Sequence, residues 1–303
     1  MSGWPWMKGA CSAIDNPIQP LDDHDDRPAI RDLIAENQAL IDKFLRDLSA
    51  DPLFQADKHD QLWALRFILS HKKKIKPALK AAKSTLVFRH ENRLDVDIRD
   101  SPPQAGNKSL ACKPLQRYIE AGLTDDAIRF CVPDPQRGVV AFIKATGIDP
   151  HALVENVDEQ DWLPAMTYFS EWSFQWVDYV SRTTGRLTKS IRVIDLQDIH
   201  LNFVNREKRR RDAASSGTLL NFYPQHVDKW YVFHAPGWIQ FPWSLARPLF
   251  PKRITEKVDI IHANHPKECK KLLKHVAMEH LPERFGGKYR PWPVEFPAPV
   301  PKI

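Results

Sequence analysis

Hydrophobic residues recur every three or four positions through the first third of the chain, which is the spacing of amphipathic helices. The first such stretch follows Pro28 and runs to Leu48. We expect a second helix, capped at its N-terminus by Asp57, and a third over residues 76–92. Together they predict a small helical unit, with a loop behind it at residues 101–107.

Beyond that loop the helical spacing gives way to short apolar runs bounded by turn residues, which are typical of buried strands. Strands are expected at residues 138–143, 191–196, 230–233 and 258–261. Helices are expected between and after them, at residues 162–180, 201–222 and 266–276. This alternation predicts an α/β fold in which crossover helices connect the strands of one sheet.

The chain has 303 residues, of which 43% are hydrophobic and 27% charged, and these proportions fit a folded globular protein. It contains 11 glycines and neither a GxGxxG nor a GxxxxGK(S/T) motif, which argues against a glycine-rich nucleotide-binding loop. The formal net charge of +6 favours contact with anionic surfaces, either lipid headgroups or nucleic acid.

The four cysteines show no CxxC spacing, so no zinc site is expected on them, and their spacing requires no disulfide. No apolar segment marks a signal peptide, and no apolar run reaches the roughly 18 residues of a membrane span. His226, His234, His262 and His265 raise a metal site as an alternative, but we expect no metal or other cofactor. No catalytic motif is found, so we expect a cytoplasmic protein that is not an enzyme.

Several short segments carry a resemblance to a known family. They lie at residues 65–69 with 88–89, 194–196, 223–225, 232–236, 247–250 and 281–287. In this order they resemble the motifs L-R-F-L with W-R, D-L-x-G, Y-P-E, I-I-N-A-P, K-P-F-L and L-P-x-x-Y-G-G of the CRAL-TRIO lipid-binding and transfer family. The resemblance extends over roughly residues 58–290.

The resemblance implies an α/β fold with an N-terminal helical domain followed by a CRAL-TRIO domain. In the second domain a mixed β-sheet floor, flanking helices and a gate helix would enclose an apolar cavity. We expect a flexible tail over residues 1–28, the helical domain over 29–125, the CRAL-TRIO domain over 126–290 and a Pro-rich tail over 291–303. The cavity must be apolar, because exposing an acyl chain to water costs about 0.8 kcal/mol per CH₂.

The resemblance also implies where a lipid headgroup would lie. A phosphate in a partly buried pocket needs cationic or N–H partners, because an unpaired buried charge is very costly. The implied positions are His71, Lys72, Gln225, Ile254 and Lys257. Only Lys257 keeps the residue of the family pattern, and Ile254 cannot donate a hydrogen bond. Lys72 can replace a lost arginine only as a point charge, so these departures argue against an inositol lipid.

Three further positions are implied to line the cavity, and they are Phe169, Ser190 and Arg192. An arginine in an apolar cavity needs an anionic partner. Two readings of Arg192 stay open: it meets an acidic group of the ligand, or a one-residue shift in strand register turns it to the other face, near a helix. A haem-binding branch of the family has histidine or tyrosine where Ser190 and Arg192 stand, so haem is not expected.

The implied gate and membrane contact is rich in aromatic and cationic residues, which favour the membrane interface. It comprises Trp238, Phe241, Trp243, Leu245, Phe250, Lys252 and Arg253. An amphipathic helix packed on its own core would show a similar pattern. The basic run at residues 206–211 is either a solvated helix face or a docking patch for an anionic membrane or a protein.

These features predict a monomer that binds one phospholipid or other hydrophobic ligand in a closed cavity and exchanges it at anionic membranes. The protein would be cytoplasmic and peripherally membrane-associated. No nucleic-acid partner is expected, because no binding-fold signature accompanies the basic residues. The alternative is an adaptor that senses a lipid without transferring it and docks membranes or protein partners through residues 206–211.

Overall fold

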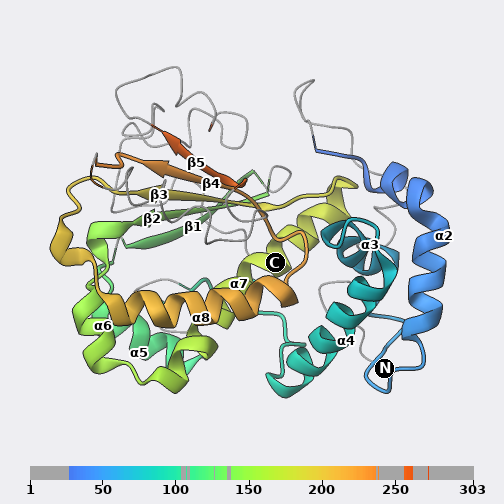
Figure 1. The fold of residues 1–303 in the computed structure, drawn as a ribbon, viewed down its shortest axis with the longest axis horizontal. Coiled ribbons are helices and arrows are strands. Elements are labelled where there is room, and N and C mark those ends of the chain that lie inside the picture. The colour runs from blue at the N-terminus through green and yellow to red at the C-terminus, as the bar shows by residue number, and fades with distance from the viewer. Residues whose placement is uncertain are drawn as a thin grey trace.

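The computed structural model describes residues 27–103, 107, 110–125, 127–134, 138–236, 238, 256–261 and 272. Figure 1 shows a helical unit beside a layered domain, in which a sheet lies over several helices. This is the mixed α/β architecture that the sequence predicts. Within the described ranges, no helix is both long and apolar enough to cross a membrane.

The front unit consists of helices α2 (Ile30–Leu48), α3 (Gln61–Ser70) and α4 (Ile75–Glu91). Their buried apolar faces share one core. Asp60 caps α3, because its side chain accepts a hydrogen bond from the backbone N–H of Trp63 at 2.9 Å. The prediction that Asp57 is the cap is therefore wrong. Both aspartates precede the apolar run, but only Asp60 lies three residues before an N–H without a helical partner.

In the described part of the chain, five strands form one sheet in sequence order: β1 (Ile128–Asp134), β2 (Gly138–Lys144), β3 (Ser190–Asp195), β4 (Val227–Phe233) and β5 (Val258–Ile261). β1 pairs with β2 in the antiparallel sense, whereas β2 to β5 run parallel. The four predicted strands are confirmed, with boundaries that move by up to three residues. β1 was not predicted, since Arg129 and Pro133 interrupt its apolar pattern.

Helices make the crossover connections that parallel strands require. Between β2 and β3 lie the 3-10 turn η1 (Ala145–Gly147) and helices α6 (Pro150–Asn156) and α7 (Glu159–Thr184), and between β3 and β4 lie the 3-10 turn η2 (Leu201–Phe203) and α8 (Arg206–Phe222). A further helix, α5 (Lys113–Gly122), precedes β1. α7 has 26 residues and is about 39 Å long. Its Trp162, Trp172 and Trp176 are fully buried, so α7 supplies much of the core beneath the sheet.

The described residues form two hydrophobic cores. One core belongs to α2, α3 and α4, and the other gathers α5, α6 and α7 with the end of α8. α5 thus packs with the second core, although the predicted helical domain of residues 29–125 includes it. The limits of the four predicted segments stay predictions.

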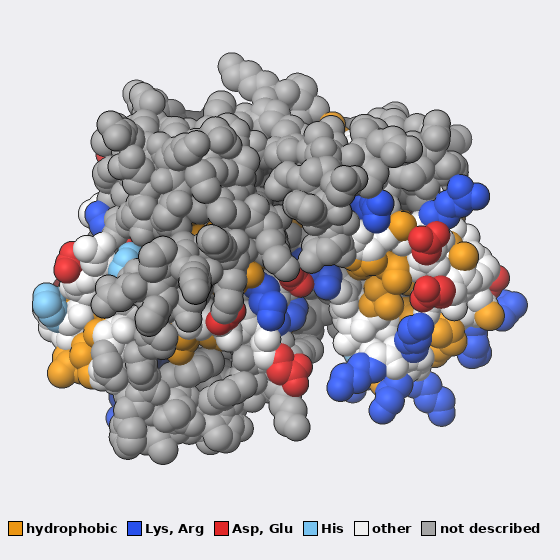
Figure 2. All heavy atoms as spheres, turned by 90° about the horizontal axis from the view of Figure 1, so that it is seen from above, with side chains coloured by type: hydrophobic (Ala, Val, Ile, Leu, Met, Phe, Trp, Pro, Cys, Tyr) orange, Lys and Arg blue, Asp and Glu red, His pale blue; other side chains and the backbone are white. Residues whose placement is uncertain are grey.

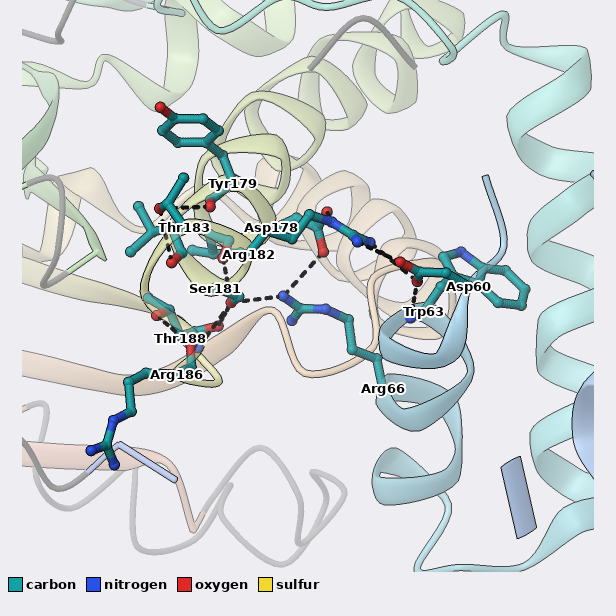
Figure 3. Close-up of polar contacts among 12 residues, drawn as sticks. Asp60, Trp63, Arg66, Asp178, Tyr179, Ser181, Arg182, Thr183, Arg186 and Thr188 are labelled. Atoms are coloured by element: carbon teal, nitrogen blue, oxygen red, sulfur yellow. Dashed lines mark hydrogen bonds and ion pairs between the residues drawn. The ribbon is translucent and has the colours of Figure 1, made fainter. Parts of the chain in front are cut away.

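Buried ion pairs fasten α3 to α7, as Figure 3 shows. Arg182 of α7 contacts Asp60 at 2.5 Å and Asp178 at 2.6 Å. Arg66 of α3 lies 3.3 Å from Asp178 and donates a hydrogen bond to Ser181 at 3.0 Å. Removing one partner from such a network leaves a buried charge without compensation. The network therefore holds the front unit in one position against α7.

Candidate ligand-binding site

Predicted site residues from several elements meet at the start of β4. Gln225 contacts the front unit, His226 contacts α7 and β3, and the carbonyl of Val227 accepts from a lysine that precedes β5. Residues 225–227 therefore bring together the front unit, α7, β3 and the segment before β5, which lie far apart in the sequence.

Gln225 connects the site to the front unit. Its backbone N–H and its Nε2 both donate to Oγ of Ser70 at 3.2 Å. His71 follows Ser70 and is the C-cap of α3; its Nδ1 donates to the carbonyl of Phe67 at 2.9 Å. The next residue, Lys72, is exposed. Gln225 has a φ of 57°, which is uncommon for a residue other than glycine, so its contacts with Ser70 support an unfavourable turn.

Ser173 of α7 is the polar centre of the predicted cavity lining. Its Oγ lies 2.7 Å from Nε2 of His226 and accepts from Nη2 of Arg192 at 3.3 Å. Phe169 lies one turn earlier, and its carbonyl is 3.1 Å from the same Oγ. Ser190 donates to the carbonyl of His226 from its backbone N–H at 2.7 Å and from Oγ at 3.1 Å. Ser190 and Arg192 therefore converge on His226 and Ser173, and Phe169 joins them through its backbone carbonyl, one turn earlier in the same helix.

Arg192 lies on β3, with Ala141 of β2 and Trp230 of β4 as its register partners. Its side chain reaches α7, as the reading with a shifted register has it. The place of Arg192 in a cavity lining stays a prediction. Burial lowers the pKa of Arg192 to about 10, so the guanidinium stays charged at neutral pH.

His226 is 6% exposed, and burial lowers its pKa well below the ordinary value. Arg192, Arg66 and Lys257 lower this pKa further, because each brings positive charge near the ring. The imidazole is therefore neutral at pH 7 and lies among cations from β3, α3 and the segment before β5. Such a place is electrostatically favourable for an anion.

Arg66 is 1% exposed, and its Nε and Nη1 are buried without a hydrogen-bond acceptor among the described residues. Its guanidinium lies over the ring of Phe174 at 5.5 Å from the ring centre. Phe174 contacts the rings of Tyr223 and His226 edge-on, at 5.3 Å and 5.8 Å between centres. Aromatic and cationic groups thus lie together beside the polar cluster of Ser173.

Lys257 lies directly before β5, where its carbonyl accepts from the N–H of Trp230 at 2.8 Å and its Nζ donates to the carbonyl of Val227. Trp238 is half-buried. The other predicted gate residues and Ile254 lie outside the described residues: Phe241, Trp243, Leu245, Phe250, Lys252 and Arg253. Lys257 therefore lies beside the start of β4, near enough to His226 for its charge to lower the pKa of that ring.

Sequence analysis missed the roles of Ser173, Arg66 and His226 at this site. The signals were present, since Arg66 belongs to the segment 65–69 and His226 directly follows the segment 223–225. Ser173 lies four residues after Phe169, on the same face of α7.

Within the described residues, His226 and His234 do not come together as the alternative of a metal site would require. His226 and His234 lie at opposite ends of β4, so roughly 25 Å of extended chain separates them. His234 instead pairs through Nδ1 with Oδ1 of Asp195 at 2.7 Å. Within the described part of the chain, no three metal-ligating side chains come together, and His262 and His265 lie outside it.

A hollow of about 500 Å³ lies away from this cluster, where α5 ends and α6 begins. Thr124, Asp149, His151 and Phe203 are among its lining residues. No predicted site residue borders it, so it is distinct from the candidate site.

Comparisons with known proteins agree on one family. The model of the CRAL/TRIO domain matches residues 126–287. A CRAL-TRIO domain-containing protein of Saccharomyces cerevisiae is 30% identical over 109 residues, covering 35% of this chain and 34% of that protein. The SEC14 cytosolic factor of Kluyveromyces lactis is 29% identical over 110 residues, covering 36% and 35%. A CRAL-TRIO domain-containing protein of Caenorhabditis elegans is 25% identical over 236 residues, covering 76% and 53%.

The chain thus spans about a third to a half of the length of these relatives. Among solved structures, the crystal structure of Sfh5 has a TM-score of 0.55 and 12% identity, with 89% of each chain covered. This last likeness concerns the fold alone. The family model spans more than half of the chain and includes the whole sheet, α7 and α8. The chain therefore belongs to the CRAL/TRIO domain family, as the resemblance of its motifs predicts.

Proposed function

We propose that this protein binds one lipid or other hydrophobic ligand in a closed cavity and exchanges it with membranes. The family binds lipophilic ligands and transfers them. The observation that carries the proposal for this chain is the convergence of Ser190 and Arg192 on Ser173 and His226, beside the ring of Phe174. In that cluster apolar rings lie beside hydrogen-bonding groups, which is the composition that a lipid with a polar end requires.

The polar end of the ligand would be acidic. Arg66, Arg192 and Lys257 all act on the same imidazole, that of His226, and their charges therefore lie close together. A phosphate or carboxylate would offset these charges, whereas an uncharged ligand would not. Arg66 supports the proposal most directly, because two of its buried N–H groups have no acceptor among the described residues.

The close contact between Ser173 and His226 could suggest a nucleophile with its base, but its surroundings disfavour that role. Ser173 lies inside α7, is fully buried and is within hydrogen-bonding distance of the carbonyl of Phe169. The cations around His226 lower the pKa of the ring, which weakens it as a general base. We propose instead that this pair orients Arg192 and that the protein carries its ligand unchanged.

Exchange would occur while the gate segment contacts a bilayer. Since exposing an acyl chain costs about 0.8 kcal/mol per CH₂, the ligand would pass from bilayer to cavity without entering water. Residues 238–253 carry the tryptophans and phenylalanines that such a contact requires. The protein would be cytoplasmic, peripherally membrane-associated and monomeric.

Two measurements test the proposal. Solvent extraction of protein purified under native conditions, followed by mass spectrometry, should yield one acidic lipid per chain. Fluorescent phospholipid should then move from donor to acceptor vesicles faster with the protein than without it. An uncharged ligand would contradict the acidic polar end. Vesicle binding without transfer of any lipid class would contradict exchange and support the adaptor.

A further inference from the structure

Residues 61–90 contain eight lysines and arginines and no aspartate or glutamate. Two of the eight, Arg66 and Arg89, are buried and form ion pairs with carboxylates of α7. The other six are exposed, and none of them forms an ion pair with a carboxylate that the structure describes. We call these six the lysine stripe: Lys72, Lys73, Lys74, Lys76, Lys80 and Lys83.

The stripe is continuous because of where its members lie on α4. Lys76, Lys80 and Lys83 are spaced by four and three residues, so they share one face of the helix. That face lies opposite Ala78 and Ala82, which pack into the core. The turn of residues 71–74 extends the stripe beyond the start of α4. In Figure 2 the front helical unit, on the right, carries lysines and arginines along its edge.

The lysines weaken the helix that carries them. Like charges four residues apart repel one another. Lys74 and Lys76 stand at the N-terminal end of α4, where the helix dipole favours negative charge, and the first turn contains no acidic residue. An anionic surface placed against this face would attract the lysines and so offset both their mutual repulsion and their unfavourable interaction with the helix dipole.

The basic run on α8 differs from the stripe, because carboxylates compensate most of its charge. Glu207 contacts Arg210 at 2.7 Å and Arg211 at 2.9 Å. Lys208 pairs with Asp212 at 2.5 Å. Arg206 and Arg209 are exposed and form no ion pair with a described carboxylate, so α8 leaves two such cations where the lysine stripe has six. Residues 206–211 are therefore a weaker docking patch than their sequence suggests.

We propose that the lysine stripe docks the protein on the anionic phospholipid surface of a bilayer, with the start of β4 facing the site of exchange. We choose a bilayer as the partner of the stripe because the proposed exchange of lipid requires contact with a membrane, so this inference rests on the proposed function. The stripe begins two residues after Ser70, which is hydrogen-bonded to Gln225 of the candidate site. Ammonium groups on flexible stems suit the diffuse charge of a membrane, whereas two-point recognition of a single acidic group would favour arginine.

The experiment compares three full-length proteins on vesicles of phosphatidylcholine with and without phosphatidylserine. The stripe variant combines Lys76→Gln, Lys80→Gln and Lys83→Gln, because glutamine has nearly the helix propensity of lysine. The matched control combines Arg206→Gln, Arg209→Gln and Arg210→Gln, which removes the same charge from α8. Co-sedimentation measures partitioning, circular dichroism checks folding, and solvent extraction measures bound ligand.

Wild-type protein should prefer the anionic vesicles, and rising salt should weaken its binding. The stripe variant should partition roughly a hundredfold more weakly, with unchanged ligand content, while the control stays within about threefold of wild type. Equal loss in both variants, or no loss in the stripe variant, overturns the proposal. So does wild-type binding to neither vesicle, which would leave an acidic protein as the occupant. Stripe-dependent binding without lipid transfer would contradict only the proposed exchange.

Discussion

Arg89 of α4 and Glu171 of α7 form a two-point ion pair, with Nη1–Oε2 at 2.9 Å and Nη2–Oε1 at 3.1 Å. Both side chains are buried, and Nη2 of Arg89 also donates to the carbonyl of Leu94 at 2.8 Å. Burial alone would lower the pKa of Arg89, but Glu171 raises it on balance. This pair joins the front unit to α7 at a second place, beyond the network around Arg182.

Glu171→Gln should lower the free energy of unfolding by about 3–5 kcal/mol, because it leaves the guanidinium of Arg89 buried without its counter-charge. Urea denaturation followed by tryptophan fluorescence measures this loss. The control is Lys43→Gln, which removes an exposed pair with Asp47. That change should cost about 1 kcal/mol or less. Comparable losses in the two variants would show that burial does not decide the strength of these pairs.

Asp60 stabilises the front unit in two ways that substitution can separate. It caps α3 through Trp63 and pairs with Arg182, which lowers the pKa of its carboxyl despite burial. Asp60→Asn keeps a capping oxygen and removes the charge, whereas Asp60→Ala removes both. Asp60→Ala should therefore be about 1 kcal/mol less stable than Asp60→Asn in thermal or urea unfolding. Equal stabilities would mean that the cap contributes nothing.

His59 should make the protein sensitive to mild acid. Burial lowers its pKa from 6.5 to about 4, and the positive charge of Arg89 acts in the same direction. The unfolded chain thus binds a proton that folded His59 does not, so stability falls as the pH falls. This contribution to stability is fully present above pH 6.5 and is lost as the pH falls from 6.5 to about 4. The total loss is about 3 kcal/mol.

The measurement is the free energy of unfolding at several pH values between 7 and 4. His59→Asn keeps an acceptor for the N–H of Gln55, which now donates to Nδ1 at 2.9 Å, and removes the titration. Its stability should fall less steeply over this range. Some slope remains, because the pKa of His226 is also lowered by burial. Identical slopes in wild type and variant would exclude His59 as the source.

Four strands could be predicted because a buried strand gives a short apolar run, and α2 and α7 because a buried helix face repeats apolar residues every three or four positions. α6 escaped prediction because it has only seven residues. α5 was also not predicted; it is as long as α3, with ten residues, but has fewer apolar positions than the apolar run of α3. The resemblance supplied the positions of Phe169, Ser190 and Arg192, but not their contacts with Ser173 and His226.

Those contacts depend on how α7 is rotated against β3, which the periodicity of neither element fixes. The same limit hid the contacts between the front unit and α7. Arg66 and Ser181 are 115 residues apart, and Arg89 and Glu171 are 82 apart. A buried arginine needs an anionic partner, but the sequence does not show which carboxylate that is, because the packing of the helices decides it.

Lys257→Ala and Arg192→Met test the acidic polar end of the ligand. Each removes one of the cations around His226, so each should weaken loading of an anionic lipid about tenfold, since a charged hydrogen bond contributes about 1.5–3 kcal/mol. Loading of a neutral lipid should change less than twofold. Lys189→Ala is the control, because Lys189 precedes β3 and contacts Asp228 at 3.7 Å. Incubation with mixed vesicles, followed by extraction and mass spectrometry, gives both loadings at once. Equal loss of anionic and neutral lipid would mean that these residues shape the cavity and do not bind an acidic group.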